Sequence, residues 1–206
     1  MPKQSLRQKI VDAGLLVVME QGYCGASVRD VVRAAGVPQG SFTNHFRTKE
    51  AFGLAVLDRY LEMVRRNLAA TLLDERLDPV RRLGTWFDLQ RDFLLSFDMR
   101  TGCLIGNLSL DAAIGSGAIR DRLGEAYDEI HRALAACLRA AAAAGQLRAG
   151  TDPEESARFL YASLQGAVLT SKVQRSPEPF ERFQRFALAT VLEVSTPPAQ
   201  KVGRAR

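Results

Sequence analysis

Residues 27–49 read SVRDVVRAAGVPQGSFTNHFRTK, which contains two short amphipathic patterns separated by a glycine. In the first pattern, the apolar side chains share one helical face at the i, i+3, i+4 and i+7 spacing: Val28, Val31, Val32 and Ala35. Ser27 is a favoured N-cap residue, and Gly36 ends the pattern. In the second, Phe42 and Phe46 lie four residues apart and mark a buried face. We therefore expect two short helices joined by a tight turn.

The opposite face of the second helix is predicted to be exposed, polar and nearly uncharged. Its side chains are small or form hydrogen bonds, with cations just beyond: Gln39, Gly40, Ser41, Thr43, Asn44, His45, Arg47 and Lys49. Such a face can contact base edges in a major groove while the cations contact phosphates. Ser27 and Arg29, at the start of the first helix, complete the predicted DNA-binding set. The alternative is a plain helical hairpin, because two amphipathic helices joined at a glycine are common in all-α proteins.

The segment AAGVPQGSFTNHFRTKEAF, residues 34–52, resembles the DNA-binding signature of the tetracycline-repressor (TetR) family of bacterial regulators. Gly36 and Val37 match the turn, and Phe46 matches the end of the recognition helix. The resemblance is strongest over residues 5–55 and extends by helix layout over the rest. It implies an all-α regulator that binds DNA. Many members carry Tyr where this chain has Thr43, and that Tyr commonly contacts a phosphate, so the Thr43 hydroxyl is the group left for this contact.

Composition excludes several classes of protein. The chain has 206 residues and is 47% apolar, enough to bury a substantial core. Its longest uncharged runs, residues 34–46 and 159–171, are 13 residues each, shorter than the roughly 20 that a membrane helix needs. The N-terminus lacks the apolar segment of a signal peptide, so we expect a cytoplasmic protein with no membrane partner. Three cysteines without metal-ligand spacing predict neither a disulfide framework nor a metal or cofactor site.

The net charge of +5 is unevenly distributed. Residues 1–50 hold seven Lys or Arg against four Asp or Glu, and the last six residues add three more cations. The middle of the chain is therefore close to neutral. A basic N-terminal module on a near-neutral body is typical of a protein that binds DNA, although a basic tail alone is more often only solvated.

The apolar spacing predicts about nine helices and no strands. A first helix over 4–21 and the hairpin form a DNA-binding domain at 1–50. A long helix from Lys49 to Leu68 leads into a helical effector-binding and dimerisation domain at 51–194, and residues 195–206 are predicted to be a disordered basic tail. The last two helices are rich in Phe, Leu and Ala, which suits either a closed core or a dimer seam. The resemblance implies the seam, hence a homodimer on a palindromic double-stranded operator.

Two further segments resemble a subgroup of these repressors that respond to reactive electrophiles and oxidants, including the N-ethylmaleimide-reductase repressors. They are GCLIGNL around Cys103 and LTSKVQRSPEPF around Lys172. The resemblance implies that Cys103 is the sensor and that Lys172 lies near it. An ammonium beside a thiol favours the thiolate, which is the reactive form.

Other interpretations of the body stay open. One alternative is that Cys103 has no sensor role and is a small buried residue, as free cysteines often are. An aromatic stripe is more often core than ligand wall, yet a reversible apolar effector could be held by aromatic residues with Cys103 merely in the wall. The full candidate effector set is Cys103, Lys172, Trp86, Phe93, Asn107, Tyr127, His131 and Tyr161.

The sequence argues against an enzyme. Its two histidines are His45 and His131, and it has no nucleophile elbow, no glycine-rich phosphate loop and no close carboxylate pair in an apolar setting. A helical dimer that binds a partner protein remains a third class. The sequence predicts a DNA-binding transcriptional regulator, by resemblance a repressor, that responds to a small-molecule effector.

Overall fold

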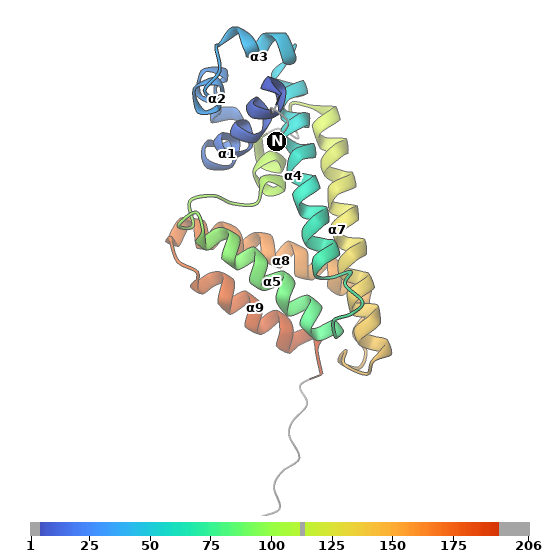
Figure 1. Cartoon of the computed structure of the whole chain (residues 1–206). Helices are drawn as coiled ribbons and strands as arrows, with labels where there is room; N and C mark the ends of the chain where they lie inside the picture. The colour runs from blue at the N-terminus through green and yellow to red at the C-terminus, as the bar shows by residue number, and fades with distance from the viewer. Residues whose placement is uncertain (1–4, 112–113, 194–206) are drawn as a thin grey trace, which may run out of the picture.

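A computed structural model describes residues 5–111 and 114–193, and its helices are arranged in two tiers (Figure 1). The described part contains nine helices and no strand, which confirms the all-α prediction. The helices are α1 Leu6–Gly25, α2 Val28–Ala35, α3 Gly40–His45, α4 Lys49–Ala70, α5 Pro79–Leu95, α6 Leu104–Asp111, α7 Gly117–Ala143, α8 Pro153–Gln174 and α9 Glu178–Val191. The predicted disorder of 195–206 lies outside the described residues.

Helix α1 is interrupted close to where its sequence pattern ends. Gly22 has φ 77° and ψ 163°, so the regular helix stops there and one further turn runs to Gly25. Positive φ is readily adopted by glycine because it has no Cβ. The sequence predicted that the first helix ends at residue 21, and the regular helix does stop at Gly22, where α1 has a kink.

The N-terminal module is held together by phenylalanines. The rings of Phe42, Phe46 and Phe52 form a triangle with centroids 5.1 to 5.5 Å apart. Helix α1 passes directly over Phe52 at Gly14, where a Cβ would lie 2.7 Å from Phe52 Cε2. The missing side chain at Gly14 lets α1 and α4 approach closely, and the three rings fix α3 against both helices.

Helix α4 connects the two tiers. It packs on α1 near its start and on α7 along its length, and Figure 1 shows α4 and α7 running side by side between the tiers. Surface ion pairs join these helices: Arg59 to Asp12 of α1 at 2.7 Å, and Arg65 to Glu129 of α7 at 2.8 Å. A displacement of α4 would therefore move the N-terminal module relative to the body.

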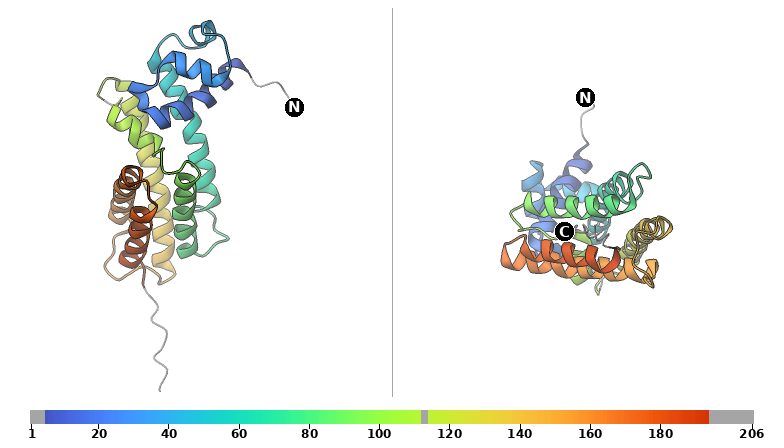
Figure 2. Two further views of the ribbon diagram at one scale, coloured as in Figure 1. Left: turned by 90° about the vertical axis from the view of Figure 1, so that its left-hand side faces the viewer. Right: turned by 90° about the horizontal axis from the view of Figure 1, so that it is seen from below.

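In the lower tier, α8 packs on α7 and α9, and α5 packs on α7 and α9 (Figures 1 and 2). Phe87 of α5 is fully buried, and its ring lies 5.2 Å from that of Phe183 of α9. Cys137 of α7 is also buried, and burial raises the pKa of its thiol to about 11. Cys137 therefore belongs to the core. Among the described helices, none is both long and apolar enough to cross a membrane.

Candidate functional site

The first helix of the predicted hairpin begins at the expected cap. Ser27 Oγ accepts from the backbone N–H of Asp30 at 3.1 Å and donates to Asp30 Oδ2 at 2.5 Å. This hydrogen bond and the nearby Arg33 guanidinium hold the pKa of the Asp30 carboxyl below its usual value. Arg29 is exposed beside this cap. The start of α2 is therefore fixed, with the exposed cation Arg29 beside the cap.

Most of the predicted reading face of α3 is exposed. Gln39, Gly40, Thr43, Asn44 and His45 all lie at the surface, as does Arg47 just beyond the helix. The Thr43 hydroxyl donates to the backbone carbonyl of Gly40 at 3.1 Å, so it retains its lone pairs as acceptors. These side chains form one polar surface, which we call the α3 face.

Ser41 does not belong to the α3 face. Its exposed fraction is 9%, so the prediction that it lies with the exposed residues was wrong. The helix begins at Gly40 and has only six residues, and it packs on both α1 and α2. Ser41 precedes the buried Phe42 and is covered with it, because so short a helix between two others has a wide inner face.

Lys49 is exposed at the start of α4 but already has partners. Its Nζ donates to the backbone carbonyl of Cys24 at 3.2 Å and lies 5.0 Å from the centroid of the Tyr23 ring. The residue before it, Thr48, caps α4 by accepting from the N–H of Ala51 at 3.0 Å. Thr48 was not among the predicted N-cap residues, although Thr directly before a helix is a favoured N-cap.

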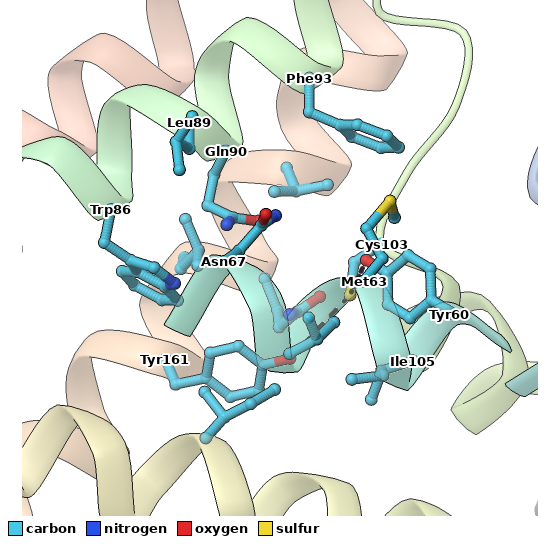
Figure 3. A pocket seen from close by; sticks show the side chains of 15 residues that line it. Tyr60, Met63, Asn67, Trp86, Leu89, Gln90, Phe93, Cys103, Ile105 and Tyr161 are labelled. Atoms are coloured by element: carbon cyan, nitrogen blue, oxygen red, sulfur yellow. Dashed lines mark hydrogen bonds between the residues drawn. The ribbon is translucent and has the colours of Figure 1, made fainter. Parts of the chain in front are cut away.

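A small cavity lies in the body between α4, α5, α6 and α8 (Figure 3). We call it the inner cavity. Its volume is about 50 Å³, which holds only a few water-sized molecules. Three predicted effector residues other than Cys103 line it, namely Trp86, Phe93 and Tyr161. The remaining lining residues are Tyr60, Met63, Val64, Asn67, Leu89, Gln90, Cys103, Ile105, Ile130, Leu164, Gln165 and Val168.

Cys103 lies in the wall of the inner cavity between two tyrosine hydroxyls. Tyr60 Oη donates to Cys103 Sγ at 3.6 Å, and Tyr161 Oη lies 3.9 Å from the same sulfur (Figure 3). The exposed fractions of Tyr60 and Tyr161 are 6% and 3%. Burial raises the pKa of both phenols well above the usual value, and the neighbouring Cys103 adds to the effect. Both phenols therefore stay protonated and able to donate.

Tyr60 was not among the predicted effector residues. It belongs to the buried face of α4, and the apolar spacing that predicts this face describes Tyr60 only as core. Its contact with Cys103 joins residues far apart in the chain, which helical periodicity cannot reveal.

A second cavity, of about 180 Å³, adjoins Cys103 from the other side. We call it the outer cavity. Predicted residues Asn107 and Tyr127 line it together with Cys103, and Gln165 and Val168 line both cavities. The Tyr127 hydroxyl lies 3.3 Å from Ser109 Oγ. Cys103 therefore borders both the inner and the outer cavity.

Two predicted effector residues lie elsewhere. Lys172, in the last turn of α8, lines neither cavity and makes no hydrogen bond to Cys103. His131 contacts the rings of Tyr127 and Tyr161, at 6.1 and 5.6 Å between centroids, but its side chain lines a charged surface groove rather than either cavity. The role predicted for Lys172 remains a prediction.

Helix α6 links Cys103 to the N-terminal module. Cys103 precedes the first residue of α6, and Asp111 is the last. The Asp111 carboxylate accepts from the backbone N–H of Tyr23 at 2.9 Å, just after the Gly22 kink. Midway along α6, Asn107 Nδ2 donates to the carbonyl of Met19 at 3.3 Å. A change at the start of α6 can therefore be transmitted directly to α1.

Nothing in the site suggests a bound metal. Within residues 5–111 and 114–193, no three His, Cys, Asp or Glu side chains come together as a group that could hold an ion.

Comparison with known families and proteins agrees with this arrangement. Residues 10–56 match "Bacterial regulatory proteins, tetR family", and residues 79–187 match "Tetracyclin repressor-like, C-terminal domain". The transcriptional repressor DhaR of Mycobacterium sp. (strain GP1) is 36% identical over 202 residues, 98% of each chain. The transcriptional regulator AcuR of Cereibacter sphaeroides is 34% identical over 185 residues, 89% of this chain and 84% of that one. The repressor NemR of Escherichia coli K12 is 29% identical over 197 residues, 94% and 95% of the two chains.

Solved structures show the same fold. A regulatory protein TetR from Rhodobacter sphaeroides superposes with a TM-score of 0.86 at 32% identity, over 91% of this chain and all of that one. The reduced form of E. coli NemR superposes with a TM-score of 0.80 at 24% identity, over 94% of this chain and 100% of that one. Regulators of this family bind DNA operators, typically as dimers with small-molecule effectors. The chain therefore belongs to the TetR family of DNA-binding transcriptional regulators, and it is a regulator rather than an enzyme.

Proposed function

We propose that this regulator is a repressor that binds a palindromic operator as a homodimer and is released when a small electrophile reacts with Cys103. The observation that carries the proposal is the position of Cys103. Its thiol borders a cavity against α4, and the residue directly precedes α6, whose far end contacts α1. An adduct at this sulfur would press on both helices that hold the DNA-binding module.

Operator binding is assigned to the α3 face and its neighbours. The exposed polar residues of α3 would contact base edges, while Arg29, Arg47 and Lys49 would contact phosphates. Ser27 is engaged in its cap, so it would contact DNA through lone pairs left on its hydroxyl. Within this proposal residues 1–50 form the DNA-binding domain and residues 51–194 the effector-binding and dimerisation domain.

The homodimer is assigned to α8 and α9. These helices leave large apolar side chains uncovered, with exposed fractions of 60% for Phe159 and 63% for Phe186. They border one shallow groove that is mostly apolar, lined by both helices. A contiguous apolar patch of this kind marks a protein interface, and a two-fold axis would pair it with its own copy. The same axis would place two α3 faces on successive turns of DNA.

The size of the two cavities beside Cys103 favours a small electrophile over a drug-sized apolar ligand. Pockets for drug-sized ligands are typically about 300–1,000 Å³, which is larger than the inner cavity of about 50 Å³ and the outer cavity of about 180 Å³ together. NemR and DhaR are both described as repressors, and the likeness to NemR is what suggests a thiol-reactive effector. The second candidate, a reversible apolar ligand held by Trp86, Phe93 and Tyr161, would require the inner cavity to expand.

The test is binding to the DNA upstream of the protein's own gene, before and after treatment with acrolein. The wild type and Cys24→Ser, a control for the exposed cysteine, should bind and then be released. Cys103→Ser should bind and remain bound. Release of Cys103→Ser to the same extent would show that Cys103 is not the switch and would favour the reversible ligand.

A second arm tests the α3 face. Asn44→Ala and Arg47→Ala should each weaken operator binding roughly five- to a hundredfold, whereas Arg81→Ala, an exposed cation on α5, should not. Unchanged affinity in the α3 variants would contradict the assignment of this face.

A further inference from the structure

The polar surroundings of Cys103 consist of hydroxyls and amides rather than charged groups. Tyr60 and Tyr161 are the hydrogen-bonding neighbours of its sulfur. The side-chain amides of Asn67, Gln90 and Gln165 also line the inner cavity, and none of them hydrogen-bonds to another described residue. The rest of the lining is apolar. Such a lining offers several hydrogen-bond donors to an uncharged ligand with an acceptor oxygen, and no cation to attract an anion.

We propose, on the basis of the function proposed above, that Tyr60 and Tyr161 make Cys103 selective for small α,β-unsaturated carbonyl compounds by hydrogen-bonding to the thiolate and to the carbonyl oxygen of the electrophile. Tyr60 and Tyr161 are thus positioning and specificity-determining residues of the sensor. Tyr60 and Tyr161 line the inner cavity but not the outer one, and the inner volume of about 50 Å³ restricts a partner at both hydroxyls to a molecule the size of acrolein.

The chemistry needs no oxidant and no leaving group. The Cys103 thiol loses its proton to water, and the sulfur lone pair forms a bond to the β-carbon of the electrophile. The electrons of the carbon–carbon double bond move toward the carbonyl, which becomes an enolate, and a proton from water then adds to the α-carbon. In sum an S–H bond and a π bond are lost, and S–C and C–H bonds are formed.

Each hydroxyl has a defined part in this addition. The hydroxyl that donates to sulfur stabilises the thiolate before attack, because hydrogen bonds to ionised acceptors are stronger than those to neutral ones. The other hydroxyl can turn to the carbonyl oxygen, whose negative charge grows as the enolate forms. Burial keeps the pKa of both phenols high, so both remain protonated donors throughout. A displacement reagent such as iodoacetamide forms no enolate and would use only the first hydrogen bond.

The experiment measures the rate at which Cys103 of the full-length protein is modified. The extent of modification at each time is determined by peptide mapping with mass spectrometry. Acrolein and iodoacetamide are compared on the wild type, Tyr60→Phe and Tyr161→Phe, which keep the ring and remove only the hydroxyl. Tyr127→Phe is the matched control, because its hydroxyl faces Ser109 and makes no hydrogen bond to Cys103. Lys172→Ala tests the ammonium implied by the family resemblance.

We expect each of Tyr60→Phe and Tyr161→Phe to slow acrolein addition by roughly ten- to a hundredfold, the effect of losing a hydrogen bond to a charged group. In Tyr161→Phe the iodoacetamide rate should fall less than the acrolein rate, so the ratio of the two rates should drop. In Tyr60→Phe both rates should fall, because both reagents attack the same thiolate. Tyr127→Phe and Lys172→Ala should stay within about twofold of the wild type, because neither contacts the sulfur. If one phenylalanine variant fails to fold, as judged by circular dichroism, the other alone tests the prediction.

Rates in the two phenylalanine variants equal to the wild-type rates, or an equal loss in Tyr127→Phe, would overturn the inference while leaving Cys103 as a sensor. A larger loss in Lys172→Ala than in the tyrosine variants would also overturn it in favour of the ammonium. Tyrosine-dependent addition without release from DNA would support the inference and contradict the proposed function. A wild-type Cys103 that does not react with acrolein would contradict both.

Discussion

Gly14 shows how one missing side chain sets the distance between two helices. Phe52 occupies the space where a Cβ of residue 14 would lie, and Phe52 is 2% exposed and enclosed by two further rings. The ring therefore has nowhere to move. The close approach of α1 and α4 depends on glycine at this position, although glycine is otherwise a poor helix residue.

We expect Gly14→Ala to lower the free energy of unfolding by about 1–2 kcal/mol, because an overpacking cost of roughly 1–3 kcal/mol exceeds the gain in helix propensity. The matched control is Gly124→Ala in α7, where a Cβ meets no atom within 4 Å. That change should raise the free energy of unfolding by roughly 0.5–1 kcal/mol. Urea unfolding of both variants checks the prediction. Equal effects at the two sites would mean that Phe52 yields easily.

His131 gives the protein a pH-dependent stability. Burial lowers the pKa of its imidazole, and the nearby Arg158 lowers it further. Below about pH 6.5 the unfolded chain therefore binds this proton more readily than the folded one, so stability falls as pH decreases through that value toward the lower folded pKa. Above pH 6.5 both forms are neutral and the contribution is constant.

The corresponding measurement is the urea midpoint at pH 7.5 and pH 5.5. The drop between the two should be smaller in His131→Gln than in the wild type, and His45→Gln, at an exposed position, should behave like the wild type. A drop of the same size in His131→Gln would show that other groups cause the acid sensitivity.

At the scale of helices, the sequence predicted most of the layout. Apolar spacing, caps and glycine breaks are local, so the end of the first regular helix before Gly22, the cap at Ser27 and the end of α2 at Gly36 could be predicted. The site was predicted less completely. Four of the candidate effector residues, Trp86, Phe93, Cys103 and Tyr161, line one cavity, and their role stays a prediction. Tyr60 was missed, and Ser41 was placed on the wrong face. Both errors concern contacts between helices, which the spacing within one helix does not determine.

Helix α6 acts as a link whose two ends have different neighbours. Cys103 directly precedes its first residue, and Asp111 at its end accepts from the Tyr23 N–H in the last turn of α1. We expect Asp111→Ala to leave the rate of acrolein addition at Cys103 unchanged while reducing the ratio of operator affinities before and after treatment. The reduction should be roughly three- to tenfold, the value of one hydrogen bond.

Asp111→Asn is the control, because its amide oxygen can still accept from the Tyr23 N–H. The measurement is operator binding by fluorescence anisotropy, with adduct formation followed in parallel. An undiminished ratio in Asp111→Ala would mean that the Asp111 contact does not carry the signal, which would then reach the N-terminal module through α4 or through the contact of Asn107 with Met19.

For the whole molecule, the exposed apolar surface of α8 and α9 predicts the oligomeric state. We expect Phe186→Glu to raise the dissociation constant of the dimer roughly a hundredfold or more, because a buried carboxylate without a partner is costly at an interface. Sedimentation velocity should then show monomers at concentrations where the wild type is dimeric. Operator affinity should fall with it.

Ile114→Glu is the control for added charge, since Ile114 is 93% exposed in the loop before α7 and away from this surface. It should leave the dimer intact. Dimers that persist in Phe186→Glu would place the interface on another face.

The last turn of α1, after Gly22, also contacts Lys49, and this contact bears on the number of counterions released when DNA binds. Lys49 is held by the carbonyl of Cys24, in the same turn whose Tyr23 N–H is bound by Asp111. A shift of α6 would therefore move a cation at the DNA backbone together with the α3 face. Each phosphate contact releases close to one condensed counterion, so losing Lys49 from both halves of a dimer would flatten the dependence of log affinity on log salt by about two. The effector would then change how the regulator responds to ionic strength as well as how tightly it binds.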